Sequence, residues 1–307
     1  MNFDNFDISY ITEWIDQEKC VIILGPDFAF DFKKSLLGEF NNFLNLKKYK
    51  SEFNEKDDFF DSHSIKPMFY QHLSRFFKSI EPTDFHKKIA EIPFHLIISS
   101  SPDVLLSQIF DEKSFDYTFD YYDKNMNPQP IAPLSKDKPL IYNLLGVQNM
   151  FNSLVLTFNQ LFDYLASILG DHKLSDGLKK QLQEAQSILF LGFKFNKWYY
   201  KLIFRLLGFY ENAMYQAPMD EIEQLNNDEI YNFYVNEFNF QFIDVSGEQI
   251  ITKLYEHYKD LNQLRKPKSK IVAGNVIQNI TNNNINIQGN GNIVANDIKD
   301  SDIDIKK

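Results

Sequence analysis

A hydroxyl, a carboxylate and an amide lie at the ends of two apolar runs and could do chemistry together. Ser101 and Asp103 follow the run at residues 95–99, and Asn143 lies in the run at residues 140–145. A carboxylate can stabilise developing positive charge, and hydroxyl and amide groups can hydrogen-bond a sugar or a water. We therefore take Asp103, Ser101 and Asn143 as candidate catalytic residues.

Glycines and turns mark the ends of further apolar runs. Gly25 and Pro26 follow residues 20–24, Gly146 follows residues 140–145, and Gly192 follows residues 188–191. In a parallel sheet covered by helices, ligands bind at the carboxyl ends of the strands. The candidate binding residues at these ends are Gly25, Pro26, Asp27, Phe28, Ser99, Tyr142, Gly146, Gly192 and Phe193.

The elements that would position these residues alternate along the chain. Short apolar runs predict strands at residues 20–24, 95–99, 140–145, 154–156, 188–191 and 240–245. Helical apolar spacing predicts helices at residues 35–46, 69–77, 84–92, 102–109, 159–169, 198–207 and 249–262. Strands buried on both faces between helices predict an α/β fold, a Rossmann-like parallel sheet with helices on both faces.

Composition limits the classes of protein. The chain has 307 residues and a formal net charge of −10, which argues against nucleic acid as the main partner. Cys20 is the only cysteine, which excludes a disulfide framework and a multi-cysteine zinc site, and we expect no metal. The sequence has no run of about 18 apolar residues, and its N-terminus is acidic and polar. We therefore expect a cytoplasmic, bacterial-type protein with no membrane contact.

The composition changes near Pro267. Residues 271–296 contain nine asparagines and no charged side chain. The unit GNVIQNITNNNINIQGN is followed by GNIVANDIKDSDIDIKK, in which isoleucines recur at matched positions. We predict a body at 1–264, a linker at 265–270 and a two-repeat β-solenoid or assembly tail at 271–307. Two coils bury too little surface to be stable alone, so the tail predicts a homo-oligomer or filament, or a partner with a matching repeat. A disordered asparagine-rich tail is the alternative.

Four segments carry a resemblance to a known family. They are LGPDF (24–28), ISSSPDVLL (98–106), IYNLLG (141–146) and FLGFKFNKW (190–198). In this order they resemble the sirtuin-like domains of prokaryotic antiphage defence effectors, and the tail resembles amyloid signalling motifs and solenoid adaptors. The resemblance implies a domain that binds NAD and either hydrolyses it or uses it for deacylation. Zinc-ribbon deacylases of that family need four cysteines, so NAD⁺ hydrolysis is the activity the resemblance implies.

The chain departs from that family at four positions, one of which is the aspartate of the late turn, where Trp198 or Lys197 stands. Asp27 stands in the glycine turn after the first strand, Ser101 stands at the asparagine position, and Leu145 stands where the catalytic histidine is expected. Leucine cannot transfer a proton. Two interpretations follow, namely a repurposed NAD⁺ glycohydrolase (NADase) that clusters through its tail to deplete NAD, and a catalytically inactive assembly, adaptor or nucleotide-sensing protein. We favour the first.

Asp27 and several other residues have structural alternatives. A carboxylate about 5 Å from a diphosphate would cost about 3 kcal/mol per charge pair at an effective dielectric constant near 20. Asp27 therefore points away, binds ribose hydroxyls, or NAD is held differently. Asp103 could instead be a first-turn charge of a helix. We expect the acidic residues 55–61 to form a solvated loop, and His72 and His86 to be surface or hydrogen-bonded helix residues.

Overall fold

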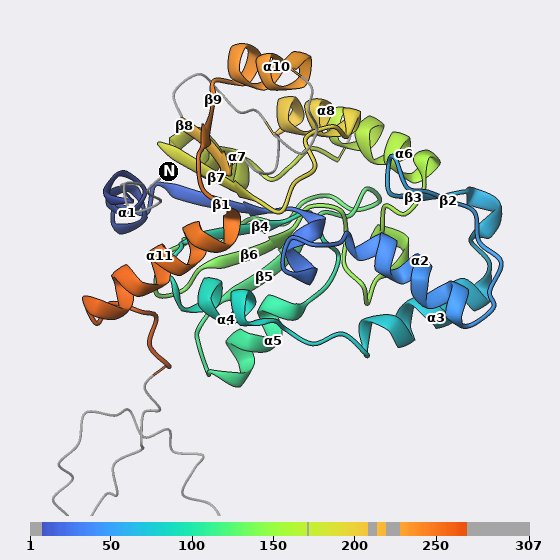
Figure 1. The fold of residues 1–307 in the computed structure, drawn as a ribbon, viewed down its shortest axis with the longest axis horizontal. Helices are drawn as coiled ribbons and strands as arrows, with labels where there is room; N and C mark the ends of the chain where they lie inside the picture. The colour runs from blue at the N-terminus through green and yellow to red at the C-terminus, as the bar shows by residue number, and fades with distance from the viewer. Residues whose placement is uncertain (1–7, 171, 208–213, 219–227, 269–307) are drawn as a thin grey trace, which may run out of the picture. The chain divides into compact units, whose positions relative to one another are not determined.

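The computed structural model describes residues 8–170, 172–207, 214–218 and 228–268. Its centre is a sheet of seven parallel strands in the order β5-β6-β4-β1-β7-β8-β9 (Figure 1). The predicted α/β, Rossmann-like fold is therefore confirmed. The strands are β1 (Cys20–Leu24), β4 (Leu96–Ser99), β5 (Thr118–Tyr121), β6 (Leu140–Asn143), β7 (Ser187–Leu191), β8 (Met214–Pro218) and β9 (Phe240–Ile243).

The central strands are apolar along their whole length because both faces of the sheet are covered. Every residue of β1, β4, β6 and β7 is buried. One face packs against α6 (Phe158–Leu169), α7 (Asp176–Glu184), α8 (Trp198–Leu206) and α10 (Asp228–Phe238). The other packs against α1 (Ser9–Asp16), α4 (Asp84–Glu91), α5 (Leu105–Glu112) and α11 (Gly247–Asp260).

A separate aromatic cluster lies beyond the carboxyl ends of the strands. It joins α2 (Leu36–Leu46), α3 (Pro67–Phe77) and the hairpin of β2 (Phe53–Asn54) and β3 (Phe59–Phe60), which lie together on the right of Figure 1. Phe40, Phe60 and Phe69 are its fully buried centre. The connections include the 3-10 helices η2 (Pro26–Phe30), η3 (Ser62–Ser64) and η4 (Phe151–Ser153).

Most predicted elements are present with shifted ends, and three predictions are wrong. The helix predicted at 102–109 begins at Leu105, because residues 100–104 form an irregular loop. Residues 154–156 are not a strand. A single backbone hydrogen bond, 2.9 Å long, runs from the N–H of Phe60 in β3 to the carbonyl of Leu156. Residues 55–61 are not a solvated loop, because they include β3 and the buried Asp58. No helix or strand predicted from the sequence covered α1, β2, β3, β5, α7, β8 or α10.

Arg265, near the end of the body, is hydrogen-bonded to the connection between α4 and β4. Its guanidinium donates to the carbonyls of Ala90 at 2.9 Å, Ile92 at 3.1 Å and Phe94 at 2.8 Å, and also to that of Lys136. Burial lowers its pKa to about 10. The first residue of the predicted linker thus packs within the body. The predicted solenoid at 271–307 lies outside the described residues.

Candidate functional site

The carboxyl ends of β4 and β6 bring the three predicted catalytic residues together. Ser101 Oγ donates to Asp103 Oδ2 through a short hydrogen bond, and Asn143 Nδ2 donates to the Asp103 carbonyl at 2.7 Å. All three residues are buried. β4 and β6 pair in parallel with Ser99 opposite Asn143, so their loops meet at one edge of the sheet. The proximity predicted from sequence is therefore what the structure has.

Both carboxylate oxygens of Asp103 are already engaged. Oδ2 accepts from Ser101, and Oδ1 accepts from Leu105 N–H at 3.0 Å, at the first residue of α5. Ser101 N–H in turn donates to Ser99 Oγ at 3.1 Å. In this arrangement Asp103 shapes the loop and accepts from the first N–H of α5.

Asp27 differs from Asp103 because one of its oxygens has no hydrogen-bond partner within the described part of the chain. Asp27 is 4% exposed, its Oδ2 lies 3.3 Å from Lys194 Nζ, and its Oδ1 is buried without a hydrogen bond. Burial raises the pKa of Asp27 to about 6, and the charge of Lys194 opposes this rise. The side chain of Lys194 is 42% exposed and supplies a cation beside the carboxylate. The cation of Lys194 would therefore offset the repulsion between the Asp27 carboxylate and a phosphate group.

The tips of β1 and β7 touch through their backbones. A Cβ on Gly25 would lie 2.0 Å from Gly192 O, and Gly192 has a φ of +80° with Phe28 N close against it. Asp27 N–H donates to Gly192 O at 3.2 Å. Side chains larger than hydrogen are excluded at both glycines. A ligand cannot enter between these two strands and must lie over their ends.

The predicted binding residues divide between the two faces of the sheet. Successive residues of a strand point to opposite faces, so Asn143 and Tyr142 diverge. Tyr142 packs in the cluster with α6 and α7, where Phe193 is also buried. Gly146 has a φ of +89° and its absent Cβ would clash with Ser153 O at 2.3 Å, so it serves a tight turn. Tyr142, Phe193 and Gly146 thus do not join the Ser101–Asp103 cluster.

Sequence reasoning missed His86 as a neighbour of this site. The ring of His86 lies 4.7 Å from that of Phe28 between centroids, and its Nδ1 accepts from Thr83 N–H at 3.2 Å. Burial lowers the pKa of His86, against the charges of Asp103 and Asp31. The expectation of a hydrogen-bonded residue holds for His86. The threonine three residues before it was the signal, because a capping box ties those two positions.

Lys197 forms a second charged contact after β7. Its Nζ lies 2.9 Å from Asp58 Oδ2 and donates to the carbonyls of Glu55 at 3.3 Å and Lys56 at 2.6 Å. Lys197 is 3% exposed. The loop between β7 and α8 therefore holds the β2–β3 hairpin through Lys197 and holds Asp27 through Lys194.

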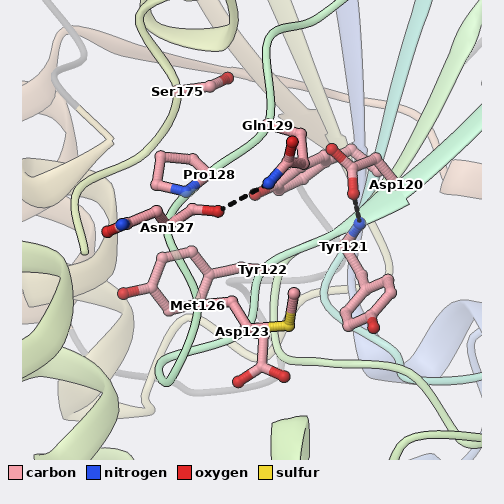
Figure 2. A pocket seen from close by; sticks show the side chains of 10 residues that line it. Asp120, Tyr121, Tyr122, Asp123, Met126, Asn127, Pro128, Gln129 and Ser175 are labelled. Carbon is pink, nitrogen blue, oxygen red and sulfur yellow. Dashed lines mark hydrogen bonds between the residues drawn. The ribbon is translucent and has the colours of Figure 1, made fainter.

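A pocket of about 190 Å³ opens at the end of β5 (Figure 2). Tyr142 lines it together with Asp120, Tyr121, Tyr122 and Asp123. Among the described residues, no group of three His, Cys, Asp or Glu side chains is placed to hold a metal ion. None of the helices described is long and apolar enough to cross a membrane.

Comparison with known proteins supports a family for this domain. Residues 95–223 match the family described as SIR2-like domain. The matched segment runs from the start of β4 past β8, and it contains Ser101, Asp103 and Asn143, whereas Asp27 precedes it. The match supports a sirtuin-like domain, and domains of this family bind NAD. No curated protein matches the chain.

Proposed function

We propose that this domain binds NAD⁺ over the ends of β1, β4 and β6 and hydrolyses the bond between its nicotinamide and ribose. The observation that carries the proposal is Oδ1 of Asp27, a buried acceptor with no donor among the residues that the structure describes. A buried unpaired carboxylate oxygen is costly, and a ligand hydroxyl would satisfy it. The SIR2-like match of the segment that follows supports NAD as the ligand.

The chemistry needs a base and a stabilised cationic ribose. Water adds to the anomeric carbon as the carbon–nitrogen bond breaks. The electron pair of that bond stays on the ring nitrogen, so nicotinamide leaves as a neutral molecule. The proton lost by water goes to Asp27, whose pKa of about 6 suits a general base near neutral pH. The negative charge of the same carboxylate favours the oxocarbenium-like transition state. Ser101, Asp103 and Asn143 hold the loop that covers the other side of the ribose.

Nicotinamide release by the full-length chain tests this proposal. We expect wild type to consume NAD⁺ and Asp27→Asn to lose about 100-fold or more in rate, since a general base contributes that much. Asp103→Asn keeps an acceptor for the first N–H of α5, and we expect its rate of nicotinamide release to stay within about tenfold of the wild-type rate. Asp260→Asn, at the end of α11, is the matched charge control. Equal rates for wild type and Asp27→Asn would overturn the assignment.

The cellular role belongs to the same proposal. We propose a cytoplasmic antiphage effector that depletes NAD when segment 271–307 joins copies of the chain into an oligomer or filament. The repeat within that segment and the resemblance to defence effectors support this role.

A non-catalytic function is the second candidate. The mutual hydrogen bonds of Ser101, Asp103 and Asn143, and Leu145 at the position of the family's histidine, favour a domain that binds a nucleotide or assembles without reacting. Such an adaptor or sensor would bind ADP-ribose and release no nicotinamide, even when forced to oligomerise. The assay above separates the two functions.

A further inference from the structure

The pocket at the carboxyl end of β5 has no role in the proposed function. β5 is the edge strand of the sheet, and the pocket lies between its end, residues 126–129 and Ser175 (Figure 2). Its volume of about 190 Å³ is smaller than the roughly 300–1,000 Å³ of pockets that hold drug-sized ligands. An occupant would therefore be a small molecule.

The sheet register places an acid and two aromatic rings on one side of this pocket. Asp120 of β5 lies opposite Tyr142 of β6, and Tyr122 comes two residues after Asp120. Residues paired across strands, and residues two apart along one strand, share a face. Asp120, Tyr122 and Tyr142 therefore project to the same side, where all three line the pocket.

The aromatic walls are held rigidly. Tyr122 OH donates to the His172 carbonyl at 2.7 Å, with Ser167 Oγ 3.0 Å away, and its ring packs on Tyr164 with centroids 5.0 Å apart. Tyr142 is 3% exposed. Rings fixed in this way lose little further entropy when a ligand binds beside them.

The pocket carries negative charge and no basic side chain. None of its lining residues is Lys, Arg or His. Asp120 Oδ1 accepts from Tyr121 N–H at 2.8 Å, and in the part of the chain that the structure describes no cation pairs with this carboxylate. Asp123 Oδ1 accepts from Asn125 N–H at 2.9 Å. Burial and the charges of both aspartates raise the pKa of Tyr121, as expected in a negative field.

We propose that this pocket binds a small organic ammonium cation. The carboxylate of Asp120 would pair with the ammonium group, and the faces of Tyr122 and Tyr142 would attract it through their quadrupoles. Tyrosine faces beside a half-buried acid select a cation over a neutral or anionic molecule of equal size. This inference stands apart from NAD binding, because it uses none of Asp27, Ser101 or Asp103.

Titration of the full-length chain with butylammonium tests the proposal, with butanol and butyrate as neutral and anionic probes. Calorimetry at about pH 8, where the carboxylates are charged, should give a dissociation constant on the order of millimolar for butylammonium alone. Asp120→Asn should weaken that binding about fivefold or more, whereas Asp260→Asn should leave it unchanged. Tyr142→Leu, which removes a ring and keeps an apolar wall, should weaken it as well.

Three results would overturn the proposal. They are no binding of butylammonium to the wild type, equal binding of butanol, and unchanged affinity in Asp120→Asn. Should Asp120→Asn fail to fold, Tyr142→Leu decides by the same measurement. Since the nicotinamide-release assay does not involve this pocket, either proposal can fail without the other.

Discussion

Asp27 is kept at a cost to stability, which is how functional carboxylates commonly differ from structural ones. The folded-state pKa of Asp27 is about 6, above the ordinary value of 3.8, so the native state binds the proton more tightly than the unfolded chain. The stability contribution is therefore most favourable below about pH 4 and is lost as the pH rises through about 6. A buried carboxylate whose pKa is raised is a candidate for a functional site.

Replacement by asparagine should relieve that cost. We expect Asp27→Asn to raise the free energy of unfolding by about 2 kcal/mol above pH 7 and to leave it nearly unchanged below pH 4. Urea denaturation of both proteins across this pH range measures the difference. A variant that is less stable than wild type at neutral pH would show that Asp27 and Lys194 form a net stabilising pair.

The sequence could predict which residues lie together at the site, but not the contacts that they make. Ser101, Asp103 and Asn143 were placed together correctly, because ends of neighbouring parallel strands meet at one edge. The commitment of both Asp103 oxygens could not be predicted, since it depends on where α5 begins within an irregular loop. The pairing of Asp27 with Lys194 depends on a tertiary contact between loops far apart in the sequence.

At the scale of elements, the loop between β7 and α8 holds the hairpin through a buried ion pair. Lys197→Met would leave Asp58 buried without its cation, and we expect a loss of about 3–5 kcal/mol in unfolding free energy. Lys180→Met breaks an exposed pair with Glu184 and should cost less than about 1 kcal/mol. Thermal or urea unfolding compares the two, and similar small losses would contradict a structural role for Lys197.

A second element depends on Asp103. Asp103→Ala removes the acceptor for the first N–H of α5 and should cost about 1–2 kcal/mol, whereas Asp103→Asn should cost less. Urea midpoints of the two variants test this. Equal stability of Asp103→Ala and wild type would show that α5 needs no cap from this side chain.

Elements that the sequence analysis found and missed differ in their burial. β1, β4, β6 and β7 are buried along their whole length and were visible as apolar runs. The edge strand β5 reads Thr-Phe-Asp-Tyr and is only partly buried, so its sequence lacks that signal. Residues 154–156 look like a strand because they are apolar, but Leu154 and Leu156 pack in the aromatic cluster of α2 and α3 instead.

For the whole molecule, we expect the body alone to bind the nucleotide and the tail to be needed for NAD⁺ consumption. We expect a chain ending at Lys270 to remain folded and to bind ADP-ribose, because Arg265 and the sheet are intact. The same chain should sediment as a smaller species than the full-length protein and should no longer consume NAD⁺. Identical sedimentation of the two chains would contradict assembly through 271–307.

The fold class was predictable because strands and helices alternate throughout the body, whereas the end of the body was less so. The basic, proline-containing segment after Leu264 looked like a linker, yet Arg265 lies buried over the ring of Phe110. The local sequence does not indicate that the guanidinium of Arg265 donates to four carbonyl groups of the body, because these lie far away along the chain.

A crystal structure of the full-length chain with ADP-ribose would test the central claim most directly. We predict a ribose hydroxyl within hydrogen-bond distance of Asp27 Oδ1, with the diphosphate near Lys194 and the nucleotide lying over the ends of β1, β4 and β6. ADP-ribose bound elsewhere, or Asp27 still without a donor at saturating ligand, would contradict it.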